Sequence, residues 1–286
     1  MTYGYGGQPR RGINMRVIIA LVIAAIGIIG YFTKRSVNPV TGETQYVSLS
    51  PQQEMALGLQ AAPEMAAQMG GTVDRSDPAA QKVGQVGNRL VSSSDAKKSP
   101  YVENFNFHLL NDPNTINAFA LPGGQIFITR ALYDQLQNEA QLAGVLGHEI
   151  GHVINRHAAE HMAKGQLGGM LATAVGVGAS DERGRGQMAA VAAQLANQML
   201  QLKFSRSDES ESDSYGLKYM AQAGYDPREM LGVMEVLRTA SKGGRTPEIL
   251  ATHPMPDTRL REIADKIKEL FPNGVPGDLS KGSPLP

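Results

Sequence analysis

The 286-residue sequence contains no cysteine and carries no net formal charge. The absence of cysteine excludes disulfides, a thiol nucleophile, thiolate zinc sites and lipid attachment through cysteine. Any metal site must therefore be built from histidine and carboxylate. Lysine and arginine together number 27, as do aspartate and glutamate, so no overall basic field favours nucleic acid, and no nucleic-acid-binding signature is present. We therefore expect no nucleic-acid partner.

One long apolar run lies near the N-terminus. Val17 to Phe32 is preceded by three arginines and followed by Lys34 and Arg35. With its flanks, the segment 15–33 reaches the lower limit of the roughly 17–25 residues that span a bilayer. We expect one uncleaved transmembrane helix, with the bulk of the chain on the periplasmic or extracytoplasmic side. A cleaved signal peptide is the alternative, although no small-residue cleavage site follows the run.

The rest of the chain divides by composition into a linker, one domain and a tail. The predicted segments are a polar N-terminal segment (1–14), the anchor (15–33), a polar linker (34–49), a folded domain (50–271) and a Gly/Pro-rich irregular tail (272–286). The 42% apolar content is enough for that domain to bury a core of its own.

Local patterns predict a mainly α domain (α+β) with a short β-sheet. Ser50 followed by Pro51 and Gln53 is a helix start with a capping box. Alternating residues from Phe105 to Leu110 and the β-rich run Gln125 to Thr129 predict strands. Helices are expected over 51–69, 77–92, 130–136, 138–162, 187–204, 208–223, 227–240 and 256–270.

A glycine-dotted apolar segment, Gly165 to Ala179, lies between the predicted helices. It is too short for an unambiguous membrane span. We expect a loosely helical segment packed on the domain. Membrane contact or a mobile lid is the alternative.

The run Gly147-His148-Glu149-Ile150-Gly151-His152 contains the pattern H-E-x-x-H. Histidines four residues apart share one face of a helix, so both imidazoles can reach one tetrahedral zinc ion. Glu149 follows the first histidine directly, so its carboxylate lies near the open coordination position and can accept a proton there. The pattern therefore predicts a zinc site with a general base.

A second pattern follows one turn later. His157-Ala158-Ala159-Glu160-His161 matches the inverted zinc motif H-x-x-E-H. The two patterns cannot both form the catalytic site on one straight helix. We expect a solvated helix end here, with His157 as a residue that packs near the first site as the alternative.

A third metal ligand has to come from another part of the chain. Ser205 to Asp213 begins a helix in which Glu209 and Asp213, four residues apart, share a face, whereas Glu211 points away. This geometry suits one carboxylate as third zinc ligand and the other as acceptor of an N–H from a ligand imidazole. A solvated acidic first turn, favoured by the helix dipole, is the alternative.

Four sequence blocks in this order resemble the gluzincin metallopeptidase family. That family includes the type I CAAX prenyl endopeptidase, the mitochondrial inner-membrane overlapping-activity protease and bacterial periplasmic assembly and quality-control metalloproteases. The blocks cover residues 115–260 and are Asn117 to Gly124, Gly147 to His152, Ser205 to Asp213, and Thr252-His253-Pro254 with Arg259. Ser212 stands where the family usually has alanine.

The resemblance implies a zincin-like metalloprotease domain with its short sheet beside the active-site helix. It implies one Zn²⁺ per chain, held by His148, His152 and Glu209, with Glu149 as general base and Asp213 supporting the site. It also places His253 near the metal, where the imidazole would stabilise an oxyanion or occupy the open position in a resting state.

Two arginines, Arg206 and Arg259, lie within these blocks. Arg206 is a candidate for oxyanion or substrate contacts, and an ion pair with the acidic helix is equally consistent with its position. Arg259 is expected to be structural.

The expected reaction is hydrolysis of peptide bonds in protein or peptide substrates. A substrate would pair with an edge strand at Gly124, Gln125 and Ile126, continuing to Thr129. By resemblance, the role is quality control of misfolded or unassembled envelope proteins. The alternatives are a catalytically silent zinc-binding scaffold, or a chaperone-like module, at the membrane.

Overall fold

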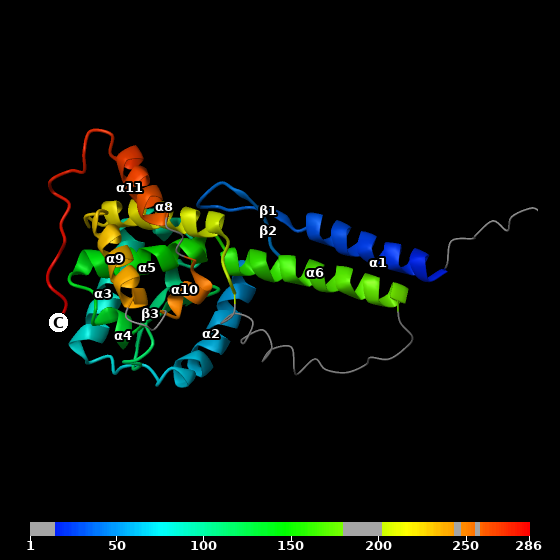
Figure 1. The fold of residues 1–286 in the computed structure, drawn as a ribbon, viewed down its shortest axis with the longest axis horizontal. Coiled ribbons are helices and arrows are strands. Elements are labelled where there is room, and N and C mark those ends of the chain that lie inside the picture. Colours follow the sequence, from blue (N-terminus) through cyan, green and yellow to red (C-terminus); the bar gives the residue numbers. More distant parts are fainter. Residues whose placement is uncertain (1–14, 180–201, 243–246, 255–257) are drawn as a thin grey trace, which may run out of the picture.

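The computed structural model describes residues 15–179, 202–242, 247–254 and 258–286. These residues form a mainly helical body with small sheets, from which helices α1 and α6 project side by side (Figure 1). The predicted mainly α class with a short sheet is confirmed.

Two capped helices open the body. Helix α2 (Pro51–Gln68) begins at Ser50, whose side chain accepts from the backbone N–H of Gln53, while the Gln53 side chain accepts from the N–H of Ser50. Helix α3 (Pro78–Ser93) begins at Asp77, whose carboxylate accepts from two backbone N–H groups of the first turn. Both helices agree with the sequence prediction to within two residues.

A three-stranded sheet follows, in the order β3–β5–β4. Strands β3 (Asn106–Leu110) and β5 (Gln125–Thr129) are parallel, and β4 (Ala118–Leu121) is antiparallel to β5. Strand β5 is thus central, and the expectation that a substrate pairs with an edge at 124–129 is wrong, because both edges of β5 are already paired. The sequence could not show that β5 is central, because a central strand and an edge strand can have the same β-rich composition.

The turn between β4 and β5 depends on glycine. Gly123 and Gly124 have φ values of 79° and 109°. A Cβ on Gly123 would also lie 2.4 Å from the Cα of Met55 in α2. The turn therefore packs directly on the backbone of α2, which places β4 beside that helix.

Helix α5 (Glu139–Ile154) forms the centre of the body and packs on α8 (Arg206–Gln222), α3 and α9 (Glu229–Lys242). A Cβ on Gly151 would lie 2.9 Å from the carbonyl oxygen of Ser212 on α8. The small residues on both helices permit this close approach, which brings their site residues together. Short helices α4 (Arg130–Tyr133) and α10 (Ile249–Thr252), 3₁₀ turns Asp95–Lys98 and Val102–Asn104, and α11 (Arg259–Leu270) complete the body.

The predicted single helix over 138–162 is two helices. Helix α5 ends at Ile154, and α6 (His157–Ala179) starts after Arg156, whose φ is +57°. The predicted linker forms a hairpin of β1 (Arg35–Val37) and β2 (Thr44–Tyr46). Side chains of this hairpin contact the backbone between α5 and α6. The Asn38 amide donates to the carbonyl of Ile154, and the Gln45 amide donates to that of Asn155. These contacts satisfy carbonyls at the end of α5, which the local sequence could not reveal.

Helix α1 (Met15–Phe32) lies along α6, and the pair forms an arm that extends from the body (Figure 1). A Cβ on Gly27 would contact Leu167 and Met170 of α6. The segment Gly165–Ala179 therefore follows α1 and does not pack on the body as expected. In the part of the chain that the structure describes, no helix meets the length and apolarity needed to cross a membrane.

The remaining predictions concern the C-terminal half. The helix expected over 187–204 lies mostly outside the described residues, and residues 202–204 are non-helical. The other three expected helices are present as α8, α9 and α11. The tail after Phe271 is largely irregular, and its residues Lys281 and Ser283 accept backbone hydrogen bonds from the start of α5.

Candidate metal centre

Two histidines on one face of α5 form the base of the site. His148 and His152 are 6% and 4% exposed, and their Nε2 atoms lie 3.0 Å apart. The four-residue spacing on a helix places both rings on the same side, as the motif predicts.

Helix α8 brings two carboxylates to these rings. The Oε1 atom of Glu209 lies 3.3 Å from Nε2 of His152, and its Oε2 atom lies 3.5 Å from Nε2 of His148. Asp213, one turn later, places Oδ1 2.9 Å from Nδ1 of His148. The Ser205 capping box with Asp208 fixes the start of α8 and hence the position of Glu209. The structure thus brings the expected third ligand and its supporting carboxylate to the histidines.

His253 completes the cluster from the C-terminal end of α10. Its Nδ1 atom lies 2.9 Å from Oε1 of Glu209 and 3.3 Å from Nε2 of His148, and its ring is 2% exposed. One ligand atom from each of His148, His152, Glu209 and His253 lies within 4.8 Å of the others. Four buried donors therefore converge on one point.

The chemistry of this donor set fits zinc. Three imidazoles and one carboxylate in a tight cluster match the nitrogen and oxygen ligands that zinc prefers. Burial by itself lowers the pKa of His148. The negative charges of Glu209 and then Asp213 outweigh this effect and raise the pKa to about 10. The two buried carboxylates thus favour a positive charge at the centre of the cluster, and a bound Zn²⁺ would supply it.

Glu149 lies beside the cluster with a free oxygen. The residue is 1% exposed, and its Oε1 atom has no hydrogen-bond partner within the described ranges. That carboxylate oxygen lies 3.8 Å from Nε2 of His253. Burial raises the pKa of Glu149 above its ordinary value, which makes the carboxylate a stronger base.

Arg259 has a larger part in the site than the sequence indicates. Its Nε and Nη2 atoms donate to the two oxygens of Asp213, each at 2.9 Å. Its Nη1 atom lies 2.7 Å from Oε2 of Glu209. One guanidinium thus orients the ligand carboxylate and the carboxylate that holds His148. Only the position of Arg259 shortly after His253 hinted at this role.

The inverted motif does not form a second metal site in the described structure. Nδ1 of His157 lies 2.9 Å from Nδ1 of His152, and its Nε2 lies 3.1 Å from Glu211. His161 contacts Asp208 at 2.8 Å. The two motif histidines therefore have different partners, and His157 supports the first site from behind His152.

The four residues expected to bind substrate lie in two places, three of them at the start of β5 and Arg206 at the start of α8. Gln125 and Ile126 are 2% and 0% exposed, and Gly124 packs against Phe105. Arg206 is exposed at the start of α8, and no hydrogen bond or ion pair of its side chain occurs among the described residues. Gln125 and Ile126 are thus buried within the sheet, and Arg206 stays exposed three residues before Glu209 on the same helix.

The strand that lies beside the metal cluster is the edge strand β4. A cavity of about 60 Å³ is lined by Phe119, Ala120 and Leu121 of β4, by Phe204 and by His253. The Phe204 ring lies over His152, with 4.1 Å between the ring centroids. The free edge of β4 and this apolar cavity were not apparent from the sequence, because they depend on the strand order.

A buried cluster of three histidines and a glutamate, built around an H-E-x-x-H helix, defines a metallopeptidase type of site. The chain belongs to peptidase family M48, whose model matches residues 78–267. It is 32% identical over 256 residues to the "Beta-barrel assembly-enhancing protease" of Yersinia pestis, covering 85% of this chain and 50% of that protein.

Two further relatives show the same likeness. The "Beta-barrel assembly-enhancing protease" of Escherichia coli (strain K12) is 36% identical over 200 residues, 67% of this chain and 39% of that protein. The "Mitochondrial metalloendopeptidase OMA1" of Schizosaccharomyces pombe is 30% identical over 265 residues, 92% of this chain and 75% of that protein. The chain spans half or less of the length of these two bacterial relatives.

Proposed function

We propose that the protein is a zinc-dependent endopeptidase. The observation that carries this proposal is the convergence of His148, His152, Glu209 and His253 beside the free carboxylate oxygen of Glu149. A silent zinc scaffold would need the four ligands but not a buried carboxylate oxygen without a hydrogen-bond partner, which is costly to maintain. Glu149 therefore favours the enzyme over the scaffold or chaperone-like module.

The mechanism follows from the positions of these side chains. Bound zinc would act as a Lewis acid that activates water and polarises the scissile carbonyl. His148, His152 and Glu209 would hold it. The Glu149 carboxylate would take a proton from the attacking water and pass it to the leaving amine.

His253 and β4 would act on the substrate side. The imidazole of His253 lies in the cluster with the three proposed ligands, where it would donate to an oxyanion or serve as a fourth ligand in a resting state. An extended peptide would pair with the free edge of β4, with a side chain directed into the apolar cavity beside Phe204. We expect neither Arg206 nor β5 to contact the scissile bond.

Protein quality control in the cell envelope is the role that the relatives support. Two of them are named for assembly of β-barrels, and a third is named as a mitochondrial metalloendopeptidase. A protease that binds substrates through main-chain pairing at β4 recognises extended, unfolded segments more readily than folded domains. Misfolded or unassembled envelope proteins are therefore the proposed substrate class.

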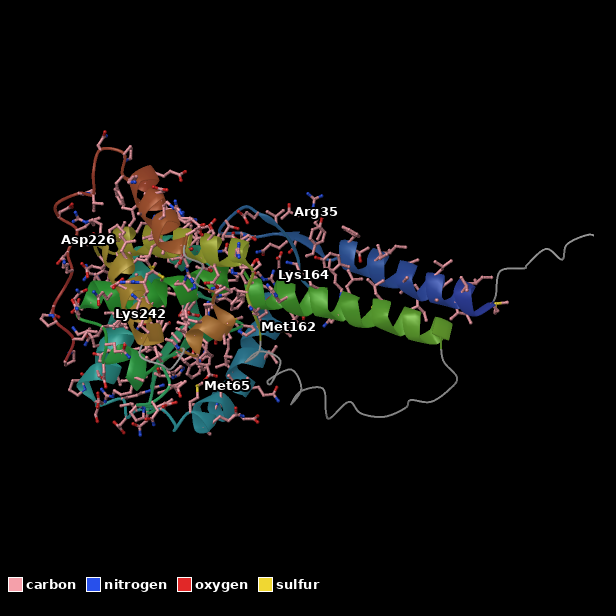
Figure 2. The ribbon with its side chains drawn as sticks, viewed as in Figure 1. Arg35, Met65, Met162, Lys164, Asp226 and Lys242 are labelled. Carbon is pink, nitrogen blue, oxygen red and sulfur yellow. The ribbon has the colours of Figure 1, made fainter. Side chains whose placement is uncertain are left out.

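Attachment to a membrane through the arm is a further part of this proposal. Ten large apolar side chains of α1 are exposed, among them Leu21 (64%), Ile26 (57%) and Ile29 (63%). Such a surface is larger than soluble proteins usually leave in water. Arg35 and Lys164 lie where the arm joins the body, a position that suits lipid headgroups (Figure 2). Vesicle flotation tests it: the full chain should float and a chain lacking residues 1–33 should not.

Degradation of casein tests the proposed activity. The purified chain should cleave casein, lose activity in a chelator and regain it when one equivalent of Zn²⁺ is added. Activity that persists after the metal content has fallen to zero would contradict the proposal.

A further inference from the structure

A second groove lies on the opposite edge of the sheet from the metal centre. It has a volume of about 770 Å³ and runs between α2 and α3 along β3. Strand β3 is one edge of the sheet, and β4, which borders the metal cluster, is the other. None of the residues that line this groove belongs to the metal centre.

The floor of the groove carries free backbone groups at Phe107, whereas the C-terminal end of β3 already pairs with residues 71–73 through a bridge between Thr72 and Leu110. The N–H of Asn106 donates to Gly124, so Asn106 and His108 direct their backbone groups toward β5, and Phe107 and Leu109 direct theirs outward. The carbonyl of Leu109 accepts from Val73. Within the described ranges, no backbone hydrogen bond of Phe107 lies outside the ladder with β5, so its N–H and C=O are open to an added strand.

The α2 wall of the groove suits an apolar peptide, whereas α3 contributes polar side chains as well. Ala66, Pro63 and the half-exposed Leu59 form the wall contributed by α2. Pro63 lacks an N–H, so the carbonyl of Leu59 loses its helical donor and is a further acceptor beside the groove. On the α3 wall, a Cβ placed on Gly84 would meet nothing within 4 Å, which shows that this wall is open.

The charge of the groove restricts what it binds. Among the described residues that line it there is no carboxylate, and Arg75 alone carries a fixed charge. Arg75 is exposed and has no ion pair among the residues that the structure describes. The groove therefore favours an acidic or neutral segment over a basic one.

We propose that this groove is an exosite that binds an extended, apolar and acidic segment of the protein substrate by adding it as a strand to β3. The proposal rests on the endopeptidase function above. Strands added at β3 and at β4 would lie about 19 Å apart, four strand spacings across the sheet. A single unfolded chain can bridge this distance with no fewer than about six extended residues. Binding at β3 would thus raise the effective concentration of the same chain at the metal centre.

Steady-state kinetics on two substrates test the exosite. Gly84→Phe fills the groove, and Arg75→Glu reverses its charge. Each should raise KM for unfolded casein about tenfold, since one of two linked sites is lost. The kcat for casein and the kcat/KM for a five-residue peptide should stay within twofold of wild type, because fewer than about six extended residues cannot reach from β4 to β3. A KM for casein within twofold of wild type in both variants would overturn the proposal.

Matched controls separate the groove from general effects. Ser93→Phe adds the same ring at the exposed end of α3, and Lys97→Glu makes the same charge change at an exposed site. Both control substitutions should leave the kcat and KM for casein and the kcat/KM for the peptide unchanged. An equal rise of KM in the controls would refute a specific groove. A dimer that dissociates in Gly84→Phe, seen by sedimentation, would instead assign the groove to a second copy of the chain and overturn the proposal.

Direct binding keeps the exosite testable if no variant cleaves casein. Fluorescein-labelled unfolded casein should bind the full chain, and Gly84→Phe should weaken this binding about tenfold relative to Ser93→Phe. Equal binding by the two variants would overturn the exosite whatever the activity. Weaker binding by Gly84→Phe without proteolysis would refute the proposed enzyme but support the groove.

Discussion

Nδ1 of His157 lies 2.9 Å from Nδ1 of His152, and the far nitrogen of His157 lies 3.1 Å from Glu211. With a metal ion on Nε2 of His152, its Nδ1 would carry the hydrogen and donate it to His157. The N–H at Nε2 of His157 would then donate to Glu211. This chain of contacts fixes the ring orientation and the tautomer of His152.

Removal of His157 should therefore weaken zinc binding. His157→Ala leaves all proposed ligands in place but frees the His152 ring, and the zinc dissociation constant should rise about 10- to 100-fold. Competition with a chromogenic chelator measures it. His161→Ala is the matched control, since His161 contacts Asp208. Equal zinc affinities of the two variants would contradict the orienting role.

The assignment of Glu209 as third ligand is tested against its neighbour on the same helix. Glu209→Ala removes an oxygen that lies 3.3 Å from His152, whereas Glu211→Ala removes a carboxylate that contacts His157 and lies outside the four-residue cluster. Zinc content after dialysis should fall much further in Glu209→Ala than in Glu211→Ala. Equal loss, or the reverse order, would exclude Glu209 as the ligand.

Arg259 should stabilise the metal-free fold strongly. It is 4% exposed and neutralises Asp213 and Glu209, so Arg259→Gln leaves two buried carboxylates without their cation. Loss of one partner from such a buried group costs about 3–5 kcal/mol in the free energy of unfolding. Urea denaturation measures it, with Arg238→Gln as control. That residue pairs with Glu235 at the surface, where an ion pair contributes about 0–1 kcal/mol. Similar losses in both variants would refute the role of Arg259.

Glu43 makes stability depend on pH. Hydrogen bonding to Glu211, followed by burial and repulsion from Glu211 and Glu160, raises the pKa of Glu43 from 4.5 to about 7. The folded state holds this proton more tightly than the unfolded state. The contribution is therefore fully present below pH 4.5 and is lost as pH rises through about 7.

Glu43→Gln should remove this dependence. Relative to wild type, the variant should gain thermal stability between pH 5 and pH 8, while Glu64→Gln, at an exposed site on α2, should follow wild type at both pH values. Melting temperatures at the two pH values measure the difference. A Glu43→Gln curve parallel to that of wild type would contradict the shared proton.

The sequence predicts the local features of this protein well and its long-range relations poorly. The capped start of α2 at Ser50 and the spacing of His148 and His152 depend on residues close in sequence, and both are found as expected. The break at Arg156 and the ion pairs of Arg259 depend on residues 40 or more positions away, and the central position of β5 depends on the order in which β3 and β4 pair with it. No local pattern records such contacts, so the edge strand beside the metal centre was misplaced.

The substitution Glu149→Gln tests the central claim most directly. Glutamine keeps the size of the buried side chain but cannot accept the proton of the attacking water. Zinc content and casein degradation are measured on the same preparations of wild type and variant. The account predicts one zinc per chain in both and proteolysis in wild type alone. Casein turnover by Glu149→Gln at the wild-type rate, with zinc still bound, would contradict it.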